Sequence, residues 1–117
     1  MEFTRLAIAT SDGVRVAGHL ARSTAWVVLE IERGEVLSRT MRTRAAEPCG
    51  SHQTFVDMLT GCDAVICGGI GEGAANALSA ASIASLVVVQ PLTIEQALQA
   101  WLAGTLVTTE ERVCLCS

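Results

Sequence analysis

The chain has few aromatic residues and no lysine. Its 117 residues include two Trp, two Phe and no Tyr, although 50% are hydrophobic. A core must therefore be built from Val, Ile, Leu and Ala. The missing lysine excludes Schiff-base chemistry and a Walker-type phosphate loop, since both need that side chain. The net charge of −4 argues against a nucleic-acid partner, because nucleic-acid-binding proteins need a basic face.

Long apolar runs are also absent. No stretch approaches the ~20 residues of a membrane span. The first residues, MEFTRLAIATSDG, lack the basic start and apolar region of a signal peptide. We therefore expect a cytoplasmic protein of one domain, without a membrane partner. Thiols stay reduced in that compartment, so the five Cys predict free thiols or metal ligands rather than a disulfide framework.

The apolar runs predict an α/β fold with one mixed sheet and helices on both faces. Residues 25–31 and 35–41 flank Arg33-Gly34, which is typical of a hairpin. The continuous runs at 63–67 and 85–91 are typical of parallel strands buried on both faces. A first strand is expected at 5–10, a short strand or extended loop at 14–18, and helices at 53–61, 74–82 and 93–104. The last helix has a capping box formed by Thr93 and Gln96.

Residues 65–78, VICGGIGEGAANAL, place four glycines between a predicted strand and a predicted helix. Gly69, Gly71 and Ala74 satisfy the weak dinucleotide fingerprint, but the next strand ends in VVVQP, without the acidic residue that the fingerprint requires. Two interpretations remain. The glycines allow backbone N–H groups and a helix dipole to bind an anion, or they only allow a tight turn packed closely on the sheet.

Histidine and cysteine supply the candidate metal ligands. His19 and His52 lie in predicted loops, where a histidine is either a ligand or a solvated side chain. Cys49 precedes His52 with Cys-x-x-His spacing, which brings a thiolate and an imidazole within reach of one metal but is short of a complete zinc site. Cys114 and Cys116 form a Cys-x-Cys pair, which bridges or chelates a soft metal, forms a strained disulfide, or remains two free thiols.

Other reactive side chains have simpler interpretations. Cys62 is expected in the core, whereas Cys67 ends a strand and faces either the core or a bound anion. Asp12 follows the first strand, at the edge where α/β sheets place function. Asp63 begins its strand at the opposite end, so a nuclease with converging carboxylates is not expected. The arginines of residues 39–44, RTMRTR, predict a solvated edge strand or, less simply, a docking patch for an acidic partner.

Three segments together resemble the dinitrogenase iron–molybdenum cofactor biosynthesis family, whose members are often called NifX-like. They are LAIATSDGVRVAGHLARSTAWVVLEIERGEV, DAVICGGIGEGAANAL and TIEQALQAWLAGTL. The resemblance covers about residues 5–107, in family order and spacing. Two departures concern the ligands: Leu20-Ala21 stands where members often have Phe-Gly, and His52 alone represents the several histidines of the connector.

The resemblance implies a ribonuclease H-like layered α/β fold, with a five-stranded mixed sheet over residues 1–107, followed by a mobile tail at 108–117. It implies a non-enzymatic carrier of an iron–molybdenum or iron–sulfur cluster, or of a precursor, in nitrogen fixation or related metallocluster assembly. Its partners would be cluster-assembly proteins, and we expect a monomer or weak homodimer.

The resemblance also leads to a set of expected ligands. The cluster is expected to contact Gly68, Gly69, Ile70, Gly71, Glu72, Gly73 and Asp12. The expected metal ligands are His19, His52, Cys49, Cys114 and Cys116. Two alternatives remain: an enzyme or sensor that binds a small phosphorylated metabolite at the glycines, and a regulatory module whose cluster site has decayed.

Overall fold

A computed structural model describes residues 3–18, 25–43, 59, 61–88, 91–106, 108 and 113–114. Its main feature is a five-stranded mixed sheet with the strand order β3-β2-β1-β4-β6. The strands are β1 (Phe3–Thr10), β2 (Ala25–Glu32), β3 (Glu35–Thr43), β4 (Ala64–Cys67) and β6 (Ala84–Val87). β1 pairs antiparallel with β2 and parallel with β4, while β4 pairs parallel with β6. This arrangement confirms the expected mixed sheet.

The hairpin between β2 and β3 forms as the sequence predicts. Arg33 and Gly34 both have positive φ, at 53° and 79°. These are the signs that a two-residue turn of type I′ requires, and they match the twist of the flanking strands. β3 is the edge strand and is exposed along almost its whole length. The solvated edge expected from residues 39–44 is therefore observed for Arg39–Thr43.

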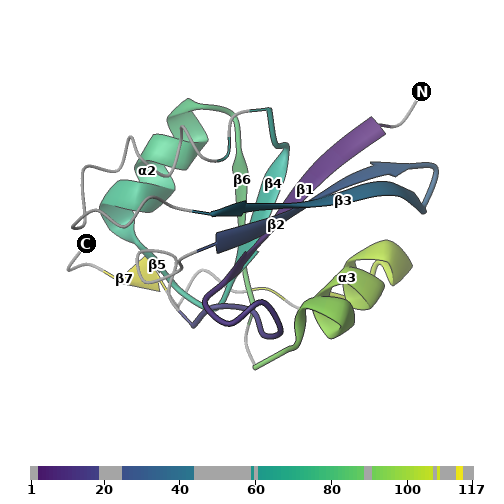
Figure 1. Ribbon diagram of the computed structural model, residues 1–117. Coiled ribbons are helices and arrows are strands. Elements are labelled where there is room, and N and C mark those ends of the chain that lie inside the picture. The colour runs from purple at the N-terminus through teal and green to yellow at the C-terminus, as the bar shows by residue number, and fades with distance from the viewer. Residues whose placement is uncertain are drawn as a thin grey trace.

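The two described helices cover opposite faces of the sheet (Figure 1). On one face, Leu78 of α2 (Glu72–Ala80) joins the buried cluster that contains Trp26 and Val65. On the other, Ile94 and Leu98 of α3 (Ile94–Ala103) join the cluster that contains Leu6, Ile8 and Ile66. Alternate residues of each central strand thus enter different cores, which explains the continuous apolar runs of β1 and β4.

Element boundaries differ from the expected ones by a few residues. α2 begins at Glu72 rather than at residue 74. The backbone is already helical immediately after the glycine turn, which is the segment of residues 68–71 between β4 and α2. β6 ends at Val87, and Val88 forms an isolated bridge with Thr108. Residues 14–18 form an extended loop with isolated bridges rather than a strand of the sheet. The helix expected at 53–61 lies largely outside the described residues.

α3 has the predicted capping box. The Thr93 side chain accepts from the Gln96 N–H at 3.1 Å, and the Gln96 side chain accepts from the Thr93 N–H at 2.9 Å. Gly104 ends the helix in the left-handed conformation. Within the described ranges, no helix is long and apolar enough to cross a membrane.

Candidate functional site

The candidate site lies where the parallel strands end. β1, β4 and β6 run in one direction, so their carboxyl ends at Thr10, Cys67 and Val87 share one edge of the sheet. The loop after β1, which is described over residues 11–18, and the glycine turn after β4 both begin there. Open α/β sheets commonly place ligands at this edge.

The loop after β1 is held by backbone hydrogen bonds on both sides. The Ala17 N–H donates to the Ala9 carbonyl at 2.7 Å, which folds the loop back onto β1. The Val16 N–H donates to the Leu92 carbonyl at 2.9 Å, and the Ile94 N–H donates to the Val14 carbonyl at 2.8 Å. The loop is thus anchored to the start of α3 as well as to the sheet.

Asp12 organises the turn at the start of this loop. Its Oδ1 accepts from the N–H groups of Val14 and Arg15, each at 2.8 Å. Thr10, which is fully buried, accepts from the Gly13 N–H through its hydroxyl at 2.9 Å. The hydrogen bonds from Arg15 and Val14 hold the pKa of the Asp12 carboxyl below its usual value. Asp12 therefore remains ionised near neutral pH, with one oxygen engaged by its own loop.

The first glycine of the turn permits a close approach of two backbones. The Gly68 N–H donates to the Ala17 carbonyl at 2.8 Å. A Cβ at Gly68 would lie 3.0 Å from both the Ala17 oxygen and the Gly18 Cα, a distance shorter than nine in ten such contacts in proteins. The tight-packing interpretation of the glycines therefore applies at Gly68, whose N–H bonds to Ala17.

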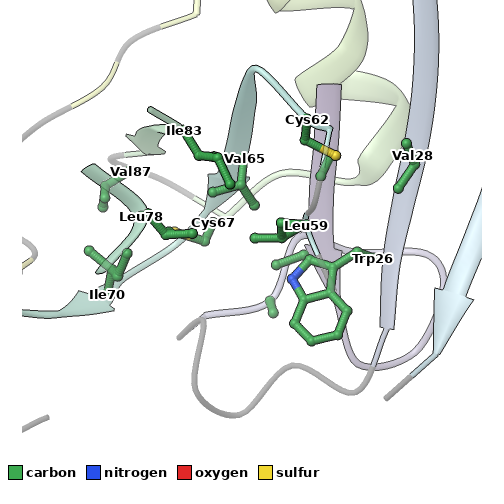
Figure 2. Close-up of a cluster of buried hydrophobic side chains, with 13 residues drawn as sticks. Trp26, Val28, Leu59, Cys62, Val65, Cys67, Ile70, Leu78, Ile83 and Val87 are labelled. Atoms are coloured by element: carbon green, nitrogen blue, oxygen red, sulfur yellow. The ribbon is translucent and has the colours of Figure 1, made fainter. Parts of the chain in front are cut away.

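Cys67 faces the core rather than a ligand. It is fully buried in the cluster drawn in Figure 2, where it lies next to Leu78. Burial raises the pKa of the Cys67 thiol to about 12, although a hydrogen bond from the Gly69 backbone acts in the opposite direction. Cys62 is buried in the same cluster, as predicted, and burial also raises its pKa. Neither thiol supplies a thiolate near neutral pH.

A two-residue strand from the end of the chain pairs with the glycine turn. β5 (Ile70–Gly71) pairs parallel with β7 (Val113–Cys114), and the register places Gly71 opposite Cys114. β5 leads directly into α2, whose first N–H groups have no partners within the helix. A cysteine of the Cys-x-Cys pair is thus positioned, by backbone register, beside the start of α2.

Most of the expected metal ligands lie outside the described residues. These are His19, His52, Cys49 and Cys116. Within the described ranges, no group of three or more His, Cys, Asp or Glu residues is arranged to hold a metal ion. His19 is the residue that follows Gly18, and Gly18 contacts the glycine turn. The roles of these ligands therefore remain predictions.

The pairing between β5 and β7 is one feature of this edge that the sequence did not predict. Val113 and Cys114 fall in a segment whose centre, VTTEER, is polar, and two residues are too few to show an alternating pattern. The contact between Gly68 and Ala17 was also not predicted, because a glycine does not indicate which backbone approaches it. Asp63, as expected, lies at the opposite edge, where its carboxylate accepts from the Arg5 N–H at 2.9 Å.

Comparison with known proteins gives one family and a consistent fold. Residues 4–104 match the family described as "Dinitrogenase iron-molybdenum cofactor". A search of curated proteins found no match. Among solved structures, the protein designated PH0822 has a TM-score of 0.79 and 24% identity, with 92% of this chain and 96% of that chain covered.

Two further solved structures support the same fold. The apo form of the orange protein from Desulfovibrio gigas has a TM-score of 0.74 and 21% identity, with 93% of this chain and 95% of that chain covered. A candidate dinitrogenase from Methanocaldococcus jannaschii has a TM-score of 0.70 and 16% identity, with coverages of 94% and 98%. At these identities the similarity shows the fold, and the fold is shared over nearly the whole length of each chain.

Proposed function

Since the chain belongs to the dinitrogenase iron-molybdenum cofactor family, we propose that it is a carrier of a metal–sulfur cluster. The cargo would be the iron–molybdenum cofactor, an iron–sulfur cluster or a precursor of either. The protein would hold this cargo without transforming it and pass it between proteins of metallocluster assembly. A ribonuclease H-like classification of its layered sheet forms part of the same proposal.

The observation that carries this proposal is the convergence of three segments at one edge of the sheet. The described part of the loop after β1 reaches Gly18, which precedes His19 in the sequence. The glycine turn leads into α2, and the register of β7 places Cys114 opposite Gly71. Histidine and cysteine are ligands that suit iron. These segments are far apart in the sequence, and their meeting would bring candidate ligands together from both ends of the chain.

Hydrogen-bond donors for the cluster would come from the residues that follow the glycine turn, at the start of α2. The Gly68 N–H already bonds to Ala17, and β5 pairs with β7. The first turn of α2, which begins at Glu72 and Gly73, carries N–H groups without helical partners and the positive end of the helix dipole. An anionic cluster or a carboxylate attached to it would be stabilised there. Asp12 would orient the adjacent loop.

A carrier must also release its cargo, so a small number of ligands suits the role. His19 would be the principal ligand, with His52 and Cys49 in support and with Cys114 and Cys116 as an accessory pair. The buried thiols of Cys62 and Cys67 are excluded from ligation by their packing. Because the ligands are soft or neutral donors, the same site would accept related clusters.

Ligand substitution tests the proposal. The wild type and a His19→Ala/His52→Ala variant would be titrated anaerobically with iron–molybdenum cofactor and with a [4Fe–4S] cluster. Visible absorption and bound iron would be measured at each step. We expect the double variant to lose at least tenfold in affinity, and Cys114→Ser/Cys116→Ser to lose less.

Cys62→Ala is the matched control, because it removes one thiol that lies in the core. It should retain wild-type uptake. Equal affinity of the wild type and the histidine double variant would show that the ligand assignment is wrong. Equal loss in the Cys62 control would show that uptake follows thiol number and not a defined site.

A further inference from the structure

A cavity lies at the opposite end of the sheet from the glycine turn. It has a volume of about 210 Å³ and is lined by Thr4, Ile31, Arg33, Gly34, Trp101 and Leu102. Thr4 is near the start of β1, and Thr10 ends that strand at the candidate cluster site. At ~3.3 Å per residue the two ends are separated by about 20 Å. The cavity is therefore distinct from the cluster site.

The lining combines an apolar wall with one cation. Ile31 is almost fully buried, and the half-buried side chains of Trp101 and Leu102 extend from the last turn of α3. Arg33 is exposed and forms no ion pair with another described residue. A guanidinium pairs with carboxylates through a planar fork, while an indole offers a flat apolar surface.

Arg33 holds this position in an unfavourable backbone conformation. Its φ of 53° lies in the left-handed region, where Asn, Asp and Gly are preferred in turns of this type. Backbone strain of this kind is concentrated at ligand-binding sites. The hairpin turn itself requires this positive φ, so the informative feature is the residue type: an arginine, rather than the preferred Asn, Asp or Gly, occupies the position and supplies the charge of the cavity.

We propose that this cavity binds a small organic carboxylate with a flat apolar body. The Arg33 guanidinium pairs with the carboxylate, and Trp101 and Leu102 pack against the body. The volume is below the ~300 Å³ of the smallest cavities that take drug-sized ligands, so the ligand has the size of a single ring with a short acidic side chain.

The end of α3 offers another reason for a cation at this position. A positive charge near a helix C-terminus is favourable, and the last turn of α3 has no basic residue. Two carbonyls of that turn already accept backbone hydrogen bonds, however. Gly104 N–H donates to Trp101 at 3.1 Å, and Thr105 N–H donates to Ala100 at 2.8 Å. If Arg33 only stabilises the end of α3, its removal should destabilise the protein. If Arg33 is instead a strained ligand-binding residue, its removal should stabilise the protein.

A matched pair of probes tests the chemistry without any variant. Phenylacetate and its neutral analogue phenylacetamide would be titrated into the full chain. Trp fluorescence and backbone NMR shifts of Gly34 and Leu102 would be followed. Trp26 is fully buried, so the fluorescence change reports Trp101. We expect saturable binding of phenylacetate that is at least tenfold tighter than that of the amide. Equal binding of both, or binding of neither, would overturn the proposal.

Arg33→Asn then separates binding from stability. Asn tolerates the left-handed conformation, so the urea midpoint should rise while phenylacetate affinity falls at least tenfold. Arg39→Gln is the control, because Arg39 lies on the same hairpin but pairs with Glu95 outside the cavity. It should bind within twofold of the wild type. A lower midpoint in Arg33→Asn with unchanged affinity would assign Arg33 to the helix end and overturn the proposal. Cluster uptake does not enter either measurement.

Discussion

Gly68 illustrates what a glycine contributes at this site. A glycine-rich turn before a helix is commonly associated with anion binding through exposed N–H groups. In this chain the Gly68 N–H bonds to the Ala17 carbonyl, and the absent Cβ leaves room for Ala17 and Gly18. The first glycine thus attaches one loop of the site to another. Any donors for a ligand must come from residues that follow it.

Replacement of Gly68 by Ala should destabilise the fold. The new Cβ would meet backbone atoms at 3.0 Å, and neither the Ala17 carbonyl nor the Gly18 Cα belongs to a flexible side chain. We expect a loss of about 1–3 kcal/mol in the free energy of unfolding, as for other overpacked sites. Urea denaturation would measure it. Gly18→Ala is the control, since no atom of the described residues beyond its chain neighbours lies within 4 Å of its Cβ position, and it should change stability by less than about 0.5 kcal/mol. Equal effects of both changes would contradict the close-packing argument.

Cys67 should make the protein sensitive to alkaline pH. Burial raises the pKa of its thiol from 9.0 to about 12, so the unfolded chain loses this proton first as the pH rises. The stabilising contribution is complete below pH 9 and is lost between about pH 9 and 12. By pH 10.5 this amounts to about 2 kcal/mol. The chain has no Lys or Tyr, so the other cysteines are the main additional source of titration in this range.

The measurement compares urea midpoints at pH 8 and pH 10.5 in the wild type and in Cys67→Ala. The variant should be less stable at pH 8 because of the smaller side chain, but its further loss at pH 10.5 should be smaller than that of the wild type. An identical alkaline loss in both proteins would show that the Cys67 thiol is not the titrating group.

At the scale of single elements, the capping box gives α3 a defined beginning. Thr93→Ala would remove the acceptor for the Gln96 N–H, and a cap of this type contributes about 1 kcal/mol. Gln99→Ala, at an exposed position in the middle of the same helix, should be neutral or slightly stabilising because alanine has a higher helix propensity. Thermal unfolding of both variants would test this. A neutral Thr93→Ala would mean that packing of Ile94, Ala97 and Leu98 alone determines where α3 starts.

The pairing of β7 with β5 should protect the backbone amides of β5 from hydrogen exchange. In a chain that ends at Thr108, the β5 amides should exchange at least tenfold faster than in the full chain, while the amides of β1 and β4 should not change. Cys114→Ser is the matched control, because it removes the thiol and keeps the strand. Exchange at β5 that is unaffected by the truncation would exclude a stable pairing.

The elements were predictable where one residue pattern dominated. The hairpin at Arg33-Gly34, the cap at Thr93 and the buried run at Ala64–Cys67 each follow from local chemistry. β5 and β7 were not predictable, since each has two residues and depends on pairing between positions far apart in the sequence. We expected α2 to begin after Gly73, because glycine has a low helix propensity. The helix instead begins at Glu72 and includes Gly73, because the preceding turn already starts it.

The site was only partly predictable for a related reason. Its location after β1 and β4 follows from the rule that parallel strands present their carboxyl ends at one edge. The side toward which each thiol points does not follow from that rule. Cys67 is the last residue of β4 and therefore lies at this edge of the sheet, but its side chain faces the core. Strand alternation places it with Val65 among the residues that pack against α2. Cys114, remote in sequence, lies opposite Gly71.

At the scale of the whole molecule, the sheet separates two regions of different chemistry. One edge gathers Asp12, the glycine turn and the strand that contains Cys114. The other end contains the cavity with Arg33 and Trp101. The central strands between them are buried on both faces. We therefore expect cluster uptake to be unaffected by Arg33→Asn, and carboxylate binding to be unaffected by changes at His19 and His52.

The measurement that tests the carrier proposal most directly is anaerobic loading followed by transfer. The purified chain would be offered iron–molybdenum and iron–sulfur clusters. Iron, molybdenum and acid-labile sulfide would be counted per chain, and the loaded protein would then be mixed with an apo acceptor of the same cluster. We predict saturable uptake near one cluster per chain or per dimer, followed by recovery of the intact cluster on the acceptor. A chain that takes up no cluster under reducing conditions, or that retains its cluster in the presence of the acceptor, would contradict the proposal.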